Sequence, residues 1–289
     1  MTVHSNIRKC WSAGALLAAA LAGAAPPLRA GDILVFSGTG AEFVADAQTS
    51  FPTQQPTLDG DRMVLAAPAD NQVLAAHALS VPGVYGCASR PIVVTMSLTL
   101  TRLSDDFDPV FLVRAGDDAI GGQVGDNPNG SARVITGTIA NNILEVASDP
   151  FVFQGAGFPA IGGSLDALIQ VTITSGGTSV RIAFGSADQT TQVASTLDGA
   201  ADLSFLLVAN SAVGSGEIYG VDALELSITA PSACAEDVDG DDDVDFADLN
   251  TLLGEFNTSG ADLMADIDCD GDVDFADLNR LLSVFNTAC

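Results

Sequence analysis

Aspartates recur at fixed short intervals near the end of the chain, and their spacing can build a metal site. Two segments, Asp237–Asp248 and Asp266–Asp277, each carry Asp at positions 1, 3, 5, 9 and 12. Closely spaced carboxylates supply hard oxygen ligands, and Ca2+ takes roughly six to eight of these in a flexible cage. The sequence therefore predicts two loops that bind two Ca2+ ions.

The spacing is that of an EF-hand loop, in which position 7 offers its main-chain carbonyl and position 12 binds through both carboxylate oxygens. The expected ligands in the first loop are Asp237, Asp239, Asp241, Asp243 through its carbonyl, Asp245 and Asp248. Those in the second loop are Asp266, Asp268, Asp270, Asp272 through its carbonyl, Asp274 and Asp277. Without the ion the clustered charges repel one another, so calcium is expected to fold this part of the chain.

The two acidic segments are copies of one longer unit. They start 29 residues apart (266 − 237), and Val244–Asn250 and Val273–Asn279 have the same sequence, so a duplication is the simplest account. Each loop is followed by apolar residues at i, i+3, i+4 and i+7, which predicts two amphipathic helices that pack on each other. These residues are Leu249, Leu252, Leu253 and Phe256 in the first copy, and Leu278, Leu281, Leu282 and Phe285 in the second. No helix is expected before either loop.

A duplicated loop-then-helix unit of this length resembles the type I dockerin module, and the resemblance covers residues 234–289. It implies calcium-dependent docking onto a cohesin domain, with positions 10 and 11 of each loop helping to select the partner. These positions hold Phe246, Ala247, Phe275 and Ala276, in place of the Ser-Thr pair common in cellulosomal dockerins. Their identity in both copies would permit two docking orientations related by a half-turn. The alternative is a self-contained calcium stabiliser without a partner.

Two residues depart from the loop pattern. Asp242 replaces Gly at position 6 of the first loop, where a positive φ is usual, so the first site is expected to bind calcium more weakly. Cys269 lies inside the second loop and could pair with Cys234 or Cys289. With Cys87, four cysteines follow the N-terminal segment, and the sequence does not choose among their three disulfide connectivities.

Residues 1–30 read as an export signal. Arg8 and Lys9 precede an apolar run, Ala13–Ala25, that is too short to span a membrane. Cleavage is expected after Ala30 or at one of the earlier small residues. No later stretch is long and apolar enough to span a bilayer, so the mature chain is expected to be secreted or on the cell surface, where disulfides form.

The charge of the chain is concentrated at its end. Formal net charge is −27 at pH 7, and residues 234–289 contribute −15 of it, from 16 Asp and Glu against the single basic residue Arg280. No basic cluster follows the N-terminal segment, so nucleic acid is not an expected partner, and an anionic membrane surface would repel the chain. Divalent cations are the partners that such a segment implies.

Residues 31–230 have the pattern of an all-β domain, with short β-branched runs separated by Gly, Pro, Asn and Asp. The clearest strand is Ile92–Leu103, in which apolar and polar residues alternate. The other expected strands are Ile33–Phe36, Met63–Ala66, Val110–Val113, Ile143–Val146, Ala167–Thr174, Ser179–Phe184, Ser204–Val208 and Val221–Thr229. About nine to eleven strands favour a jelly-roll-like antiparallel sandwich, followed by residues 231–289 as a small all-α dockerin-like calcium unit.

The predicted sandwich offers little for catalysis. Its one histidine, His77, lies in Gln72–Ser80, which reads as a helix or a loop, and a lone histidine is more often structural than catalytic. Its few glutamates show no pairing of the kind that glycosidases use, and it lacks Trp for stacking on flat polysaccharides. No catalytic residue is assigned.

These patterns predict a secreted calcium-binding protein that docks to a cohesin-like domain or a cell-envelope protein. The sandwich would be non-catalytic and associated with polysaccharide binding or breakdown. One alternative is a structural cell-surface protein that uses the calcium unit as its envelope anchor. A second alternative is a small glycoside hydrolase, acting on O-glycosyl bonds.

Overall fold

A computed structural model describes most of the chain after the N-terminal segment. The described residues are 32–66, 71–79, 91–105, 107–125, 130–174, 177–194, 197, 203–209, 218–229, 234–241, 243–260, 263–268 and 270–288. The predictions for the export signal, Asp242, Cys87, Cys269 and Cys289 fall outside these residues. Cys234 is described and is disulfide-bonded.

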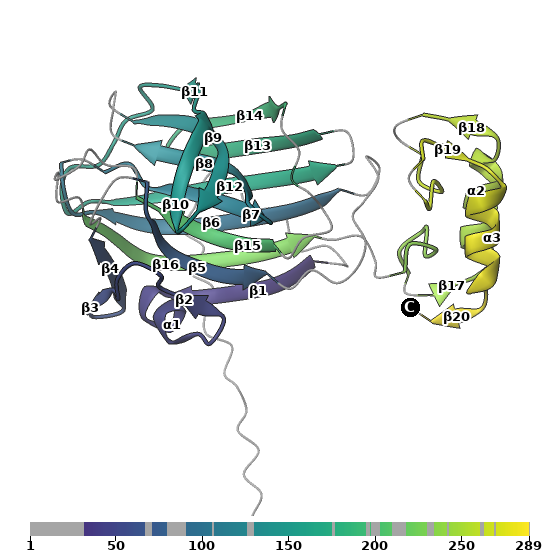
Figure 1. Cartoon of the computed structure of the whole chain (residues 1–289), viewed down its shortest axis with the longest axis horizontal. Coiled ribbons are helices and arrows are strands. Elements are labelled where there is room, and N and C mark those ends of the chain that lie inside the picture. Colours follow the sequence, from purple (N-terminus) through teal and green to yellow (C-terminus); the bar gives the residue numbers. More distant parts are fainter. Residues whose placement is uncertain are drawn as a thin grey trace, which may run out of the picture.

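The larger part of the chain is a sandwich of two antiparallel sheets, as the sequence predicts (Figure 1). The first sheet has the order β14-β13-β12-β6-β16-β4-β3, with β1 also paired to β16. Its strands are β1 (Asp32–Thr39), β3 (Thr57–Asp59), β4 (Arg62–Ala66), β6 (Ile92–Arg102), β12 (Ser164–Thr174), β13 (Gly177–Phe184), β14 (Ala187–Val193) and β16 (Ile218–Thr229).

The second sheet has the order β10-β9-β8-β7-β15-β5-β2, with β11 also paired to β9. Its strands are β2 (Thr49–Ser50), β5 (Val73–Leu79), β7 (Val110–Ala115), β8 (Asp118–Gly125), β9 (Ser131–Ala140), β10 (Ile143–Ser148), β11 (Phe151–Phe153) and β15 (Leu203–Val208). A short helix, α1 (Gly40–Ala45), follows β1. Gly40 allows it to approach the first sheet, because an added Cβ would lie 2.1 Å from the carbonyl oxygen of Val221.

Alternation along the strands fills the space between the two sheets. In β6, Val94, Met96, Leu98 and Leu100 are buried, and the threonine and serine residues between them are less so, which confirms the predicted pattern. The sheets approach closely at β8, where a Cβ on Gly122 would lie 2.7 Å from Ile182 Cδ1 in β13. Each large side chain buried in this layer contributes about 1.5–3 kcal/mol to stability.

The central strands of the second sheet, β7, β8 and β15, are buried on both faces. Successive residues of β7, such as Phe111 and Leu112, belong to different apolar clusters. One cluster fills the space between the sheets, and the other lies on the opposite face of the second sheet. The members of that outer cluster are Val73, Val110, Leu112, Ala119, Ile135, Ile139, Leu144, Leu206 and Val208.

The second sheet covers this outer cluster by curling over it. Its last strand, β10, returns to the residues just before β5, where Gln72 and Ile143 form an isolated antiparallel bridge. Two hydrogen bonds flank the bridge, from Val73 N to Asn142 O at 2.9 Å and from Leu144 N to Asn71 O at 2.8 Å. Figure 1 shows β9 and β10 crossing steeply over the other strands. The outer face of this sheet is therefore closed by an apolar core of its own.

Two expectations about local structure need correction. Residues Gln72–Ser80 were expected to form a helix or a loop, but Val73–Leu79 is strand β5. Alanines in this run favour a helix by propensity, and pairing with β15 and β2 overrides them. Strands β8, β9 and β14 are not among those predicted, because glycines and polar residues obscure their alternation.

Residues 234–288 form a unit with a separate apolar core. Its helices are α2 (Phe246–Glu255) and α3 (Phe275–Ser283), and its two-residue strands are β17 (Asp243–Val244), β18 (Thr258–Ser259), β19 (Asp272–Val273) and β20 (Thr287–Ala288). Leu252 and Leu281 are fully buried in this core. No helix lies directly before either loop in the described residues 234–236, 258–260 and 263–265, as expected. None of the helices in the described parts of the chain has the length and apolar character needed to cross a bilayer.

His77 is a packed residue of the sandwich. It is 1% exposed, lies near the rings of Phe36 and Phe43, and has its Nδ1 2.8 Å from Thr49 Oγ1. Burial lowers the pKa of His77, and the carboxylate of Asp46, 4.0 Å from Nδ1, offsets this only in part. These contacts agree with the structural role expected for this residue.

The lowered pKa of His77 makes the stability of the sandwich depend on pH. In the unfolded chain His77 becomes protonated near pH 6.5, whereas in the folded protein it stays neutral to lower pH. The free energy of unfolding should therefore fall as the pH drops from about 7.5 to 5.5. Urea unfolding of the full chain at the two pH values measures this. The His77→Gln variant should be less stable at both and should lose most of the pH dependence. An equal pH dependence in the variant would contradict this assignment.

Candidate metal centre

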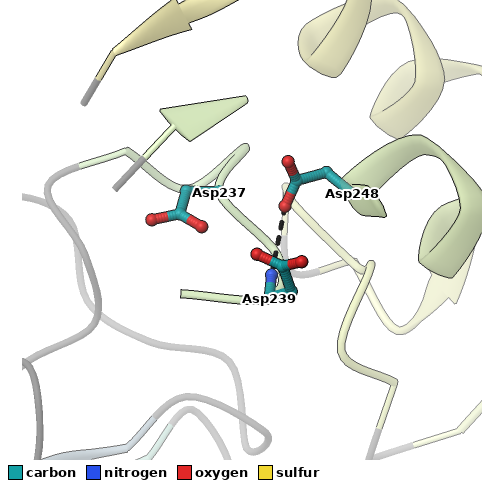
Figure 2. Close-up of side chains that lie close together, drawn as sticks. All are labelled: Asp237, Asp239 and Asp248. Atoms are coloured by element: carbon teal, nitrogen blue, oxygen red, sulfur yellow. Dashed lines mark hydrogen bonds between the residues drawn. The ribbon is translucent and has the colours of Figure 1, made fainter. Parts of the chain in front are cut away.

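The first acidic loop brings carboxylates from both of its ends together. Asp237, Asp239 and Asp248 each place an oxygen so that the three atoms lie within 4.8 Å of one another, and Asp243, Asp245 and Asp248 do the same. Figure 2 shows Asp248 reaching from α2 to the loop that carries Asp239. Hard oxygen donors in this arrangement suit a divalent cation such as Ca2+.

Asp248 is the centre of the first loop. It is fully buried, and its two oxygens accept hydrogen bonds from different parts of the loop. Oδ1 accepts from Val238 N at 2.6 Å and from Asp239 N at 3.1 Å, and Oδ2 accepts from Asp245 N at 2.8 Å. Asp245 in turn caps α2, with its side chain accepting from Ala247 N. One carboxylate therefore ties the start of the loop to the start of the helix.

The second loop repeats this arrangement. Asp266, Asp268 and Asp277 have oxygens within 4.8 Å of one another. The buried Asp277 accepts from Ile267 N at 2.7 Å, from Asp268 N at 3.2 Å and from Asp274 N at 2.8 Å. At position 6, Gly271 has a φ of +96°, a conformation that glycine adopts without strain.

The structure gathers some of the predicted ligands more closely than others. The two clusters in the first loop and the one in the second contain Asp237, Asp239, Asp243, Asp245, Asp248, Asp266, Asp268 and Asp277. Four other predicted ligands, Asp241, Asp270, Asp272 and Asp274, lie outside these clusters. Three of them accept hydrogen bonds from main-chain N–H groups two residues further along: Asp241 from Asp243 N, Asp270 from Asp272 N, and Asp274 from Ala276 N. The role predicted for position 7 was its carbonyl, and in the first loop the carboxylate of Asp243 joins the cluster.

Electrostatics in both loops favour a bound cation. The pKa of Asp239 is raised, first by desolvation and then by the negative charge of Asp248 and its neighbours. The pKa of Asp268 is raised for the same reasons, with Asp277 as the largest charge. Raised carboxylate pKa values mean that the negative charges oppose one another in the absence of an ion. A divalent cation would reverse that penalty.

Each loop is also held by the other copy of the repeat. Strand β17 of the first loop pairs with β20, which follows α3, and β19 of the second loop pairs with β18, which follows α2. Asn286 N donates to Val244 O at 2.6 Å, and Asn257 N donates to Val273 O at 2.7 Å. Both asparagines have positive φ, 64° and 60°. This role of Asn257 and Asn286 was not predicted, although Phe-Asn-Thr recurs at 256–258 and 285–287.

The residues predicted to select a partner lie on the surface. Phe246 is 69% exposed and Phe275 is 68% exposed, and Ala247 and Ala276 are exposed beside them. Leu253 and Leu282, expected in the packed stripes, are instead 54% and 50% exposed. The last apolar residue of each stripe, Phe256 or Phe285, packs against the core in part.

The sequence matches no protein-family model and no curated protein. Among solved structures, the chain is similar to alginate lyase vAL-1 from Chlorella virus, at 5% identity and a TM-score of 0.42, over 67% of this chain and 99% of that one. It is also similar to arcelin-5, a lectin-like defense protein from Phaseolus vulgaris, at 13% identity and a TM-score of 0.40, over 70% and 100%. A third is a xylan beta-1,4-xylosidase from Bacillus halodurans, at 11% identity and a TM-score of 0.37, over 63% of this chain and 39% of that one. All three are distant likenesses.

Replacing either central carboxylate should empty one loop and spare the other. Asp248→Asn removes a charge and places an amide donor against N–H groups, so calcium affinity at the first loop should fall at least about 10–100-fold, the usual loss for an outer-shell partner. Calorimetric titration of the full chain should then count one tight ion instead of two. Asp277→Asn is the matched variant for the second loop. Two unchanged sites in both variants would refute these assignments.

The crossed pairing of the repeats predicts crossed effects on metal binding. Asn286→Val should weaken the first loop, although residue 286 follows the second helix, because a β-branched residue resists positive φ. Asn257→Val should weaken the second loop. Glycine at either position tolerates the same φ and should restore binding. Combining each asparagine variant with Asp248→Asn or Asp277→Asn leaves one loop able to bind calcium and so identifies the loop affected. The pairing would be contradicted if Asn286→Val weakened only the second loop, or Asn257→Val only the first.

Proposed function

We propose that this chain is an exported calcium-binding protein whose C-terminal unit attaches it, in a calcium-dependent manner, to a cohesin-like domain or another cell-envelope protein. One observation carries the proposal. The carboxylate clusters of the two loops include the buried Asp248 and Asp277, which lie in the first turns of two helices that expose Phe246 and Phe275 at their starts. Metal binding in the loops and the position of the exposed helix starts are thereby linked.

The chain's own residues define what calcium would do here. The clustered aspartates would hold the ion, and the ion would supply positive charge that cancels their repulsion. Asp245 and Asp274 cap the two helices and adjoin the exposed phenylalanines. Order in each loop therefore fixes the start of its helix and the direction in which Phe246 or Phe275 projects. Loss of the ion would loosen both.

The sandwich is proposed to be non-catalytic and associated with polysaccharide binding or breakdown. The association with polysaccharide rests on the dockerin-like character of residues 234–289. The absence of catalysis is supported by His77, which is buried among aromatic rings and not directed to solvent. Secretion or display on the cell surface is part of the same proposal and rests on the signal-like residues 1–30.

A structural cell-surface protein is the second candidate, and one observation favours it. The outer face of the second sheet holds the apolar cluster around Leu112 and Leu206 under the curled β9 and β10. This face is therefore filled with side chains and is not an open groove for a sugar chain. In this candidate the calcium unit anchors the sandwich and no glycan is bound.

Capture from the envelope fraction of the source organism tests the docking proposal. The full chain, immobilised with millimolar calcium, should retain one envelope protein that a chelator releases. The matched control is the Asp248→Asn/Asp277→Asn double variant, which should retain none. Two bound calcium ions without chelator-released capture would support the self-contained stabiliser instead. A chain that binds no calcium would overturn the proposal altogether.

A glycan array separates the two candidates for the sandwich. The full chain with calcium should bind a polysaccharide or oligosaccharide if the first candidate holds, and the chelated chain should bind it as well. Silence across plant, algal and bacterial glycans would favour the structural surface protein.

A further inference from the structure

Four exposed apolar side chains of the C-terminal unit, two from each repeat, lie on the surface of its two packed helices. We infer that this surface, named the twin-helix surface and made of Phe246, Leu253, Phe275 and Leu282, is covered by a partner whose apolar face is framed by lysine and arginine. The inference rests on the proposed docking function and adds the chemistry of the partner. It differs from a surface in which each repeat offers an independent docking site.

Helix geometry and aromatic contacts join the two halves of this surface. Phe246 and Leu253 are seven residues apart on α2, which places them on one face two turns from each other, and Phe275 and Leu282 match them on α3. Each exposed Phe then meets the Phe that follows the other helix. The ring centroids of Phe246 and Phe285 lie 5.1 Å apart at 81°, and those of Phe256 and Phe275 have the same geometry.

The exposure of this surface is unusual for side chains of this size. All four residues are at least half exposed, and they lie within two helices that pack together. Aromatic edge contacts between the repeats hold Phe246 and Phe275 in place, so they are presented as rigid anchors. Exposed apolar side chains grouped on two packed helices are typical of protein interaction sites.

The negative charge of the C-terminal unit favours a partner with basic residues. Residues 234–289 carry 16 acidic residues and one basic residue, for a net −15, and two calcium ions would reduce this to about −11 (−15 + 4). Carboxylates adjoin both phenylalanines, because Asp245 and Asp274 immediately precede them. The single cation, Arg280, is engaged with Glu236 at 3.5 Å and with Ile267 O.

This charge argues against two other occupants. A second copy of the chain would bring like charges together across the apolar contact, which opposes association. The rest of the same chain, residues 1–233, is also acidic, with a net charge of −12 (−27 + 15). A partner with basic side chains around an apolar face complements both the apolar side chains of the surface and the negative charge of the unit. The opposite charges would also accelerate association at low salt.

A designed peptide probe tests the inference. The probe is a fluorescent amphipathic helix with leucine on one face and lysine on the other, and a matched peptide carries glutamate in place of lysine. The full chain in calcium should bind one Leu/Lys peptide, less tightly as salt rises, and should not bind the Leu/Glu peptide. Anisotropy gives the affinity and the stoichiometry.

Variants of the chain distinguish the contribution of the apolar side chains to peptide binding from that of the negative charge. Phe246→Ser and Phe275→Ser should each weaken binding of the Leu/Lys peptide about tenfold or more, because both belong to one site. Phe151→Ser, which alters a 42% exposed phenylalanine of the sandwich, should leave it unchanged. Retention of two calcium ions shows that each variant is folded.

Several outcomes would overturn the inference. Equal peptide binding by the phenylalanine variants would mean attraction by charge alone. Equal binding of the Leu/Glu peptide would show that basic residues on the partner are not required. Binding of two peptides per chain would mean that each repeat has a separate site. A calcium-dependent dimer in sedimentation, abolished by Phe246→Ser, would assign the surface to a second copy. Chelator-released capture of an envelope protein is measured separately, so its success beside a failed peptide test would leave the docking proposal standing.

Discussion

Repulsion among carboxylates is the constraint on which the C-terminal unit depends. In each loop three aspartate oxygens lie within 4.8 Å of one another, an arrangement that is unfavourable unless positive charge or hydrogen-bond donors compensate it. The chain supplies part of the compensation through main-chain N–H groups aimed at Asp248 and Asp277. Asp248 and Asp277 also connect each loop to its helix. The balance of charge around these two carboxylates therefore controls the position of the helix start and of the exposed phenylalanine beside it.

The sandwich obeys a different constraint, the need to bury both faces of a strongly apolar sheet. Strand β7 reads Val-Phe-Leu-Val-Arg-Ala, and a nearly continuous apolar run of this kind cannot leave one face in water. The curl of β9 and β10, closed by the Gln72–Ile143 bridge, gives the second face its own cover. Closure removes a potential groove and also protects strand edges from pairing with other chains. The burial of both faces of the central strands, as far as the described residues show it, is thus a consequence of their composition.

Sequence reasoning succeeded where a pattern is local. Strand β6 was evident from strict alternation, and aspartates of both predicted loops form clusters that could hold a metal ion. It failed where tertiary contacts decide. Strand β5 resembles a helix until β15 pairs with it, and the glycines of β8 conceal a strand that they allow to pack closely. The 3.6-residue period placed Leu253 and Leu282 in the packed stripe, although each helix buries only a narrow side against small loops. Pairing across the repeats was beyond prediction, because two-residue strands have no periodicity to detect.

The crossed pairing makes the two repeats depend on each other. Strand β18 of the first repeat pairs with the second loop, and β20 of the second repeat pairs with the first loop. A single repeat would therefore end in a strand that has no partner within that repeat. Such a copy could satisfy its main chain only by exchanging tails with a twin, as in a swapped dimer. The duplicated chain is equivalent to that dimer fused end to end. The two repeats should therefore fold and unfold together, because neither contains both strands that complete its own loop.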